Sequence, residues 1–355
     1  MERLRQLQQY RENRRARPTA IYRPFLRDYQ NPLTYYSDSE FRRRFRFTKH
    51  GVTETLLPLI NEEISFGSVR NSAASSMEQL LIFLRFLATD GFHIVSGDLA
   101  AVTRRHESSV SRYVHRVAGA FARKSHRFIR LPQQGDMTYV QQKFYSIARF
   151  PGVSGTIDGV HIPIAAPWGP EAERYRNRKN TFSLNVQVIG DADLQIRDVV
   201  ARWYGSAHDA RIFAESSVRF RFENGEIDGI LLGDAGYPLK SYLMTPVNNP
   251  QSQEEERYNT AHKRTRISIE RLFGCWKRRF PALSYGLRFS PERSSVIVVA
   301  AAVLHNLARG MKEPDFDDEL WGLEPEDNPE GLPTNQQTHH NAIARRNAII
   351  RSHFS

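Results

Sequence analysis

The sequence predicts an α/β protein in which an all-helical N-terminal region precedes a core built on a mixed β-sheet. Through residues 51–148, apolar residues recur at helical spacing. From about residue 150 the pattern changes to short β-branched runs separated by turn residues. A hairpin, a helix and a further strand then follow one another, an order typical of a mixed sheet covered by helices.

The composition bounds the class of protein. A chain of 355 residues with 40% hydrophobic residues is long enough for one large domain or two of medium size. No apolar run approaches the roughly 20 residues of a membrane span, so we expect no membrane association. The one cysteine, Cys275, excludes a disulfide within the chain and a cysteine-based zinc site. We therefore expect a reducing compartment, the cytosol or the nucleus.

Positive charge is concentrated at the N-terminus. The net charge is +11, which predicts a polyanionic partner. Residues 1–49 hold thirteen Arg and Lys against five acids, so we interpret residues 1–50 as a basic arm. Its run "RRRFRF" at 42–47 fits either a nucleic-acid contact or a solubilising surface. Residues 313–355 are interpreted as an acidic, proline-rich linker followed by a C-terminal helix.

The helical region, residues 51–148, contains a pattern typical of a helix-turn-helix. "SMEQLLIFLRFLATDG" predicts a helix that Ser76 caps and Gly91 ends. In the following "SGDLAAVTRRHESSVSRYVHRVAGAF" we expect a short helix from Leu99, a turn at 106–107 and a second helix from Ser108 with a valine face. That second helix would present three polar residues to a DNA groove: Ser109, Arg112 and Arg116. Two packed helices of a bundle are the alternative.

The segment 149–312 is expected to form the sheet domain. "GTIDGVHIPI" at 155–164 is a buried strand that contains Asp158, and "NVQVIGDADLQIRDV" is a hairpin whose acids belong to the turn. "SAHDARIFAESSVRFRF" is a helix in which Asp209 lies near the start. There Asp209 has two open interpretations, stabilisation of the helix start or a place near a metal. We interpret His208 as a structural residue in preference to a metal ligand.

Two carboxylates occupy positions where charge is unfavourable. Asp158 interrupts an apolar strand, and Asp234 follows the short strand "ILL". If the two strands are neighbours, the carboxylates repel unless a cation lies between them. Oxygen ligands without thiolates favour Mg²⁺ or Mn²⁺.

A third acid is found on an amphipathic helix. In "KRTRISIERLFGCWKRRFPAL" an apolar stripe runs from Ile269 to Phe280, and Glu270 lies at its border. Basic residues surround Glu270, among them Arg264, Arg266 and Lys277. This combination suits a site that cuts phosphodiesters, since arginines hold phosphates and the acid completes a metal site. An ordinary Arg266–Glu270 helix pair is the alternative.

A set of motifs in one order resembles the PIF/Harbinger DDE transposases and especially the domesticated harbinger transposase-derived nucleases. The motifs are "GTIDGVHIPI", "NRKNTFSLNVQVI", "GSAHDARIF", "LLGDAGYPL", "YNTAHKRTRISIERLFGCWKRRFP" and "AAVLHNL". The resemblance covers about residues 50–310 and implies an RNase H-like catalytic core. It carries an Asp-Asp-Glu triad onto Asp158, Asp234 and Glu270. Thirty-five residues separate the last two, in agreement with the family's pattern.

The resemblance implies a metal-dependent DNA endonuclease or transposase. Two metal ions roughly 3.5–4 Å apart would flank the scissile phosphate. Asp158 would bridge them, Asp234 would hold one and Glu270 the other. The resemblance also implies a nuclear location, with import that depends on a separate Myb-like DNA-binding partner. A homodimer is expected because transposition joins two ends.

Further basic residues are candidate DNA contacts: Arg178 and Lys179 in "YRNRKN", and Lys263 before the Glu270 helix. A solvated surface is the alternative for each. Two other functions share the fold: a catalytically silent DNA-binding or chromatin protein, and a nuclease that acts on RNA.

Overall fold

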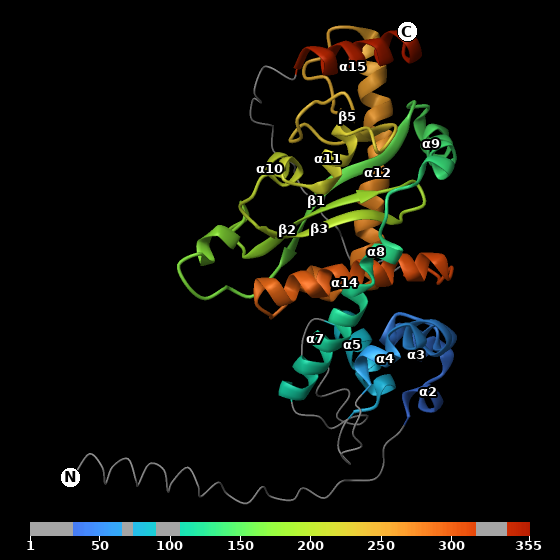
Figure 1. Cartoon of the computed structure of the whole chain (residues 1–355), viewed down its shortest axis with the longest axis vertical. Helices are drawn as coiled ribbons and strands as arrows, with labels where there is room; N and C mark the ends of the chain where they lie inside the picture. Colours follow the sequence, from blue (N-terminus) through green and yellow to red (C-terminus); the bar gives the residue numbers. More distant parts are fainter. Residues whose placement is uncertain (1–30, 66–73, 90–106, 317–338) are drawn as a thin grey trace, which may run out of the picture.

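The computed structural model describes residues 31–65, 74–89, 107–316 and 339–355. Along its long axis, a helical region and α15 lie at opposite ends, and the β-sheet lies between them (Figure 1). Within these ranges, no helix combines the length and apolar character needed to cross a membrane. The fold is α/β with a mixed sheet and a helical N-terminal region, as the sequence predicts.

The helical region consists of short helices and one longer helix. They are α2 (Pro32–Tyr35), α3 (Asp38–Phe45), a π-helical turn (Gly51–Leu56), α4 (Leu57–Ile64), α5 (Ser76–Leu87) and α7 (Glu107–Arg123). Helix α5 confirms the predicted helix, but its cap is Ser75 and not Ser76, and Gly91, the predicted end, lies outside the described residues. Ser75 accepts a hydrogen bond from the Glu78 amide while the Glu78 carboxylate accepts one from the Ser75 amide. This reciprocal pair satisfies two amides that the helix start leaves open.

Helix α7 is the predicted second helix of the helix-turn-helix. Val110, Val114 and Val117 are buried, and the helix packs on α5 and α14. The predicted first helix at 99–102 lies outside the described residues. What the structure supports is one amphipathic helix whose apolar face is covered.

Part of the predicted basic arm belongs to the packed body. Ser37 caps α3, and Phe45 and Phe47 are buried. The aromatic residues of "RRRFRF" therefore contribute to the core, which removes them as a nucleic-acid surface. This segment also meets the start of the C-terminal region, since Arg42 donates hydrogen bonds to the carbonyls of residues 314 and 315.

Five strands form one sheet in the order β3-β2-β1-β4-β5. The strands are β1 (Val153–Pro163), β2 (Ser183–Gly190), β3 (Ile196–Tyr204), β4 (Ile230–Leu232) and β5 (Leu243–Met244). Strands β1, β2 and β3 are antiparallel, whereas β4 pairs with β1 and β5 with β4 in parallel. This arrangement is the RNase H-like core. The β2–β3 hairpin confirms the prediction, and Asp191 lies in its turn, where it accepts from two backbone amides.

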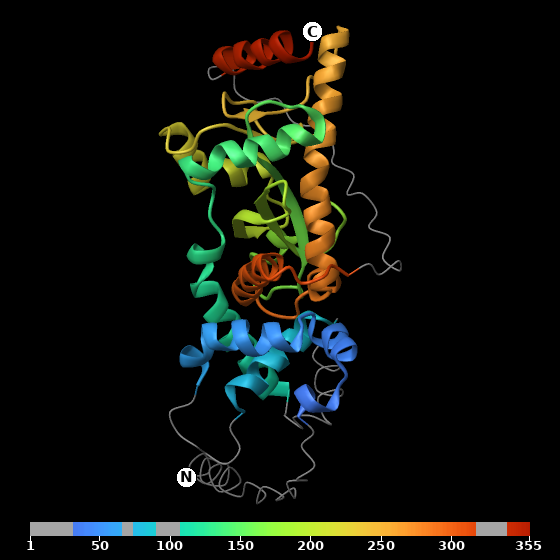
Figure 2. The ribbon, with the colours of Figure 1, turned by 90° about the vertical axis from the view of Figure 1, so that its right-hand side faces the viewer.

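Helices cover the sheet and close both ends. They are α8 (Ser125–Phe128), α9 (Gln134–Ala148), a short 3-10 helix (Ala172–Tyr175), α10 (Asp209–Ala214), α11 (Ser217–Glu223), α12 (Gln253–Arg279), α13 (Ala282–Tyr285), α14 (Pro291–Gly310) and α15 (His339–His353). The helix predicted across "SAHDARIFAESSVRFRF" is two helices, because Ser216 caps a new one after α10. Helix α14 lies between the sheet and α7 (Figures 1 and 2).

Helix α12 is the longest element and packs along β1 and β2 (Figure 2). Ile269, Leu272, Trp276 and Phe280 are fully buried, which confirms the predicted stripe. The helix begins at Gln253, so Lys263 lies within it and not before it. Its N-terminal half contacts α15, and Phe354, the residue after α15, packs against Tyr258.

Candidate metal centre

Strand β1 places Asp158 on the face that α12 covers. Thr156, two residues earlier on the same face, hydrogen-bonds to Ser268 of α12, because side chains alternate along a strand. Asp158 lies opposite Val188 of β2 and is buried. One of its oxygens, Oδ1, accepts from the Gly159 amide at 3.0 Å. Its carboxylate is thus held inside the protein.

Strand β4 delivers Asp234 to the same place. It runs parallel to β1, and Thr156 pairs with Leu232. Asp234 lies two residues beyond that pair, so the two strands carry both acids in one direction. Its Oδ1 accepts from the Gly236 amide at 2.9 Å. The expectation that neighbouring strands bring these two carboxylates together is confirmed.

Asp209 joins them from the opposite side of β1. Carboxylate oxygens of Asp158, Asp209 and Asp234 all lie within 4.8 Å of one another. Among the described residues, this is the group with the spacing of a metal site. We call these three residues the acid cluster.

Asp209 is the first residue of α10, where its charge can stabilise the helix start, but its side chain does not cap the helix. His208 is the N-cap of α10, without a side-chain capping bond, and Asp209 accepts instead from Asn185 Nδ2 at 2.9 Å. The approach depends on Gly159, because a Cβ there would overlap Asp209 Oδ1 and lie 3.0 Å from Asn185 Oδ1. A glycine directly after Asp158 and an asparagine in a buried strand were the sequence signals for this arrangement.

Arg266 is the cation that contacts Asp158. From α12, its Nη2 donates to Asp158 Oδ2 at 2.6 Å, and its Nη1 lies 3.5 Å from Glu270 Oε1. The Arg266 side chain is 16% exposed and that of Glu270 is 59% exposed. Glu270 therefore reaches the acid cluster only through Arg266. The Arg266–Glu270 pair, given above as the alternative, is present together with the contact to Asp158.

Burial and mutual repulsion disfavour the charge of the cluster. Burial raises the pKa of Asp158 to about 7, against the opposing effect of Arg266 and with a further contribution from the two other acids. Burial also raises the pKa of Asp209, although Asn185 opposes this shift. A divalent cation favours ionised carboxylates and offsets both effects. Three oxygen donors at this spacing therefore fit a hard divalent metal.

The remaining candidates beside the cluster have diverse environments. His208 is outside the three-acid group, and Arg178 donates to its Nδ1 at 2.9 Å. Lys179 is exposed. On α12, Lys263 and Arg264 are exposed and Lys277 is half-buried. His262, beside them, is buried under β5, where its Nε2 bonds to the Met244 carbonyl.

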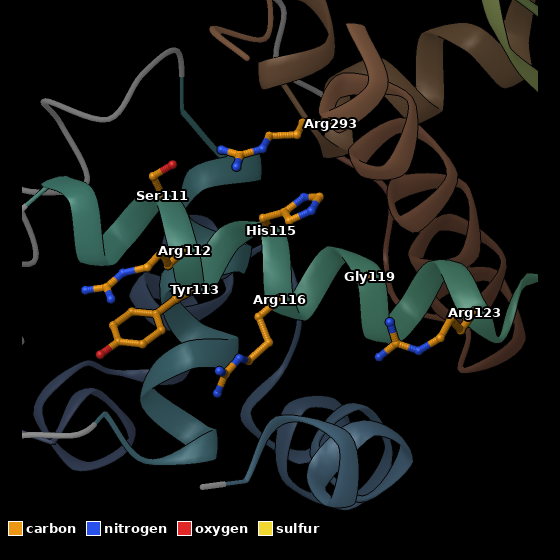
Figure 3. A pocket seen from close by; sticks show the side chains of 8 residues that line it. All are labelled: Ser111, Arg112, Tyr113, His115, Arg116, Gly119, Arg123 and Arg293. Carbon is orange, nitrogen blue, oxygen red and sulfur yellow. The ribbon is translucent and has the colours of Figure 1, made fainter. Parts of the chain in front are cut away.

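The α7 candidates lie on its outer side, away from the valine face. Arg112 and Arg116 are exposed and Ser109 is half-buried. Arg112 donates to Ser109 Oγ at 3.2 Å. Figure 3 shows the arginines along this helix, with Arg293 of α14 nearby.

A parallel β1–β4 pair that carries two aspartates, backed by a helix with a glutamate, defines the class: an RNase H-like protein of the DDE type. In agreement, residues 157–306 match the family described as DDE superfamily endonuclease.

Relatives extend the match over most of the chain. The human protein "Putative nuclease HARBI1" is 33% identical over 313 residues, which cover 84% of this chain and 86% of that protein. The Xenopus laevis protein of the same name is 30% identical over 307 residues, with 84% and 86% covered. The Arabidopsis thaliana "Protein ALP1-like" is 24% identical over 277 residues, with 72% and 66% covered. No solved structure matches. The chain belongs to the DDE superfamily of endonucleases, in the family of harbinger transposase-derived nucleases.

Proposed function

We propose that this protein is a DNA endonuclease of the Harbinger type that uses Mg²⁺ or Mn²⁺, two ions per site, to cleave phosphodiester bonds. The observation that carries the proposal is the acid cluster, in which three carboxylates meet within 4.8 Å on the core of a DDE superfamily protein. Such ions supply an activated water or hydroxyl and neutralise the leaving oxygen.

The chain's own residues divide the work. Asp158, Asp209 and Asp234 would hold the metal, since each offers an oxygen to one point. Glu270 is proposed as a further ligand, supported by its place one helical turn after Arg266 on α12. Arg266 holds Asp158 in position. Once a metal ion neutralises the Asp158 carboxylate, the planar guanidinium of Arg266 can bind a phosphate oxygen of the substrate. Buried surroundings limit the access of bulk water and strengthen each charge interaction.

One observation favours the second candidate, a catalytically silent DNA-binding protein. Arg266 already pairs with Asp158, and Glu270 is more than half exposed and outside the acid cluster. An arginine that stays there would neutralise the site without a metal. Metal binding to the acid cluster separates the two candidates.

DNA as substrate, a Myb-like partner, a homodimer and a nuclear location complete the proposal. The basic composition supports DNA, and the family membership is the ground for the partner. A fluorescent fusion expressed with and without a Myb-like protein tests location: nuclear signal that rises with the partner is expected. A signal excluded from the nucleus in both cases contradicts it.

Cleavage of supercoiled plasmid tests the activity. Wild type should nick or linearise DNA with Mg²⁺ or Mn²⁺ and not with EDTA. Asp158→Ala, Asp209→Ala, Asp234→Ala and Glu270→Gln should each lose about a thousandfold or more in rate. Asp228→Ala and Glu256→Gln, both at exposed positions, are matched controls. RNA and RNA–DNA hybrids in the same assay test for an RNA-directed nuclease. Metal binding without cleavage, even with the partner and its DNA, would support the silent candidate.

A glycine variant tests the geometry without loss of a carboxylate. Gly159→Ala should displace Asp209 and reduce the rise in melting temperature that Mn²⁺ gives wild type. Gly135→Ala is the control, because its added methyl meets no atom within 4 Å. An undiminished rise in Gly159→Ala would remove Asp209 from the metal centre.

A further inference from the structure

Arginines form a straight line on the outer face of α7. Arg112, Arg116 and Arg123 stand at positions i, i+4 and i+11, with Gly119 at i+7, so all four share one side of the helix. They line one hollow together with His115 and Arg293, as Figure 3 shows. At about 1.5 Å per residue, the first two arginines lie about 6 Å apart along the axis. That spacing is near the distance between successive phosphates of a strand.

Gly119 has no packing reason to be a glycine. A glycine inside a helix costs about 1 kcal/mol relative to alanine. Glycines of this kind commonly allow another helix to approach, but a Cβ at Gly119 would meet only Arg123 Nη1, at 3.2 Å. The bare backbone instead leaves the floor of the hollow open between Arg116 and Arg123. A ligand that approaches the backbone of α7 closely would explain why this position is a glycine.

Arg293 joins this hollow to a second one. Arg293 and Ser111 line both, so the groove continues from α7 past α14 to the loop between β1 and β2. Burial lowers the pKa of His115, and the charge of Arg293 lowers it further. The guanidinium of Arg293 therefore acts on a residue that lines the groove. Arg123 is balanced by Glu63 at 2.9 Å.

The second hollow has a different character. Its lining includes two arginines, Arg288 and Arg293, and two acids, Glu171 and Glu292, of which Glu171 pairs with Arg174. Trp168 stands at its edge with 100% of its surface exposed. A fully exposed tryptophan forgoes about 2 kcal/mol of burial. A neutral hollow with an aromatic face suits a base, whereas the positively charged hollow on α7 suits phosphates.

We propose that this continuous groove binds a DNA strand that has an unpaired nucleotide beside a duplex: Arg112, Arg116 and Arg293 hold phosphates, and Trp168 stacks on the unpaired base. The inference rests on the proposed function in that DNA is the substrate, and it assigns Arg293 and Trp168 roles that the sequence did not indicate. Helix α7 is then a backbone-binding element, in contrast to the base-reading helix that the helix-turn-helix pattern suggests.

Fluorescence anisotropy in EDTA tests the groove separately from the metal centre. The probes are a labelled blunt duplex and the same duplex with a short single-stranded extension, in two unrelated sequences and over a salt series. The variants are Arg116→Gln, Arg293→Gln and Trp168→Ala. Arg345→Gln on α15 and Phe220→Ala on α11, both exposed, are the matched controls.

Each arginine variant should weaken binding to all probes alike and lower the salt slope by about one unit. Trp168→Ala should weaken binding to the extended duplex about tenfold and leave the blunt duplex unchanged. Equal affinity of Trp168→Ala and wild type for the extended duplex overturns the proposal, as do arginine variants with the wild-type salt slope. A loss in Arg116→Gln that depends on probe sequence also overturns it, in favour of base reading. If the protein cleaves DNA but the groove variants bind like wild type, the proposed function stands and the groove proposal fails. If the groove binds DNA as described but no cleavage occurs, the groove proposal stands and the proposed nuclease function fails.

Discussion

Helices α12 and α7 are both amphipathic and rich in arginine, yet α12 takes two of its arginines into the protein and α7 does not. On α12, Arg266 is 16% exposed and Arg279 only 2% exposed. On α7, Arg112 and Arg116 remain exposed. The difference arises from which side of each helix carries the arginines. The sides of α12 that bear Arg266 and Arg279 face the rest of the protein, whereas α7 packs on α4, α5 and α14 and carries its arginines on its outer side.

A buried arginine must satisfy its donors within the protein, whereas an exposed one can also bond to water or to a ligand. Arg279 donates to the carbonyl of Arg46 and to that of Pro314, each at 2.9 Å. Arg266 pairs with a buried carboxylate. These two arginines of α12 therefore maintain the fold and the acid cluster, whereas Arg112 and Arg116 of α7 face solvent. The four predictions below test this division.

The largest effect on stability is expected at Arg279. Arg279→Met removes the hydrogen bonds to the carbonyls of Arg46 and Pro314 and the ion pair with Asp315. The change should lower the free energy of unfolding by about 3 kcal/mol. Arg116→Met should stay within about 0.5 kcal/mol of wild type. Urea unfolding at pH 7 measures both. Equal losses in the two variants would show that burial does not separate the two helices.

His262 tests the buried side of α12 through pH. Burial lowers its pKa to about 4, whereas in the unfolded chain the value is about 6.5. Between these values only the unfolded state binds the proton, so this contribution to stability is complete above about pH 6.5 and is lost as the pH falls toward 4. The loss should amount to about 3 kcal/mol at pH 4. Urea unfolding between pH 4 and 7 measures the free energy of unfolding against pH. This profile should be flatter for His262→Gln than for wild type, and unchanged for the exposed-site control His353→Gln. Parallel profiles would contradict the assignment.

Arg266 tests whether a cation from α12 competes with metal. Arg266→Met removes the partner of Asp158, so Mn²⁺ no longer displaces a guanidinium. The stabilisation by saturating Mn²⁺ should exceed that of wild type by about 2 kcal/mol. Melting temperature in a Mn²⁺ series measures it, with Arg271→Met, exposed on the same helix, as control. A smaller Mn²⁺ effect in Arg266→Met would show that the arginine supports the metal site.

The smallest effect is expected on α7. Gly119→Ala should raise the free energy of unfolding by up to about 1 kcal/mol, because the methyl meets only a flexible arginine. The affinity for DNA should fall, since the methyl narrows the groove. Urea unfolding and anisotropy on the same protein measure the two effects. If Gly119→Ala raises both the free energy of unfolding and the affinity for DNA, Gly119 is not needed for the ligand to approach the helix.

Local patterns were sufficient for much of the fold. The spacing of Ile269, Leu272 and Trp276 determines which side of α12 is buried, and the turn "GDAD" determines the hairpin, because both depend on neighbours in the chain. The placement of Asp158 and Asp234 followed as well, since adjacent parallel strands leave few positions for their ends.

The sequence by itself determined the α/β class, the sheet-borne aspartates and the helix that bears Glu270. Tertiary structure alone decided that Asp209 joins them, that Arg266 lies between Asp158 and Glu270, and that the aromatic residues of "RRRFRF" are buried. It also decided that Arg293 and Trp168 share a groove with α7. Each of these depends on segments distant in the chain that meet at a distance set by side-chain packing and register. A periodic pattern specifies which face of an element is covered, but not which residue covers it.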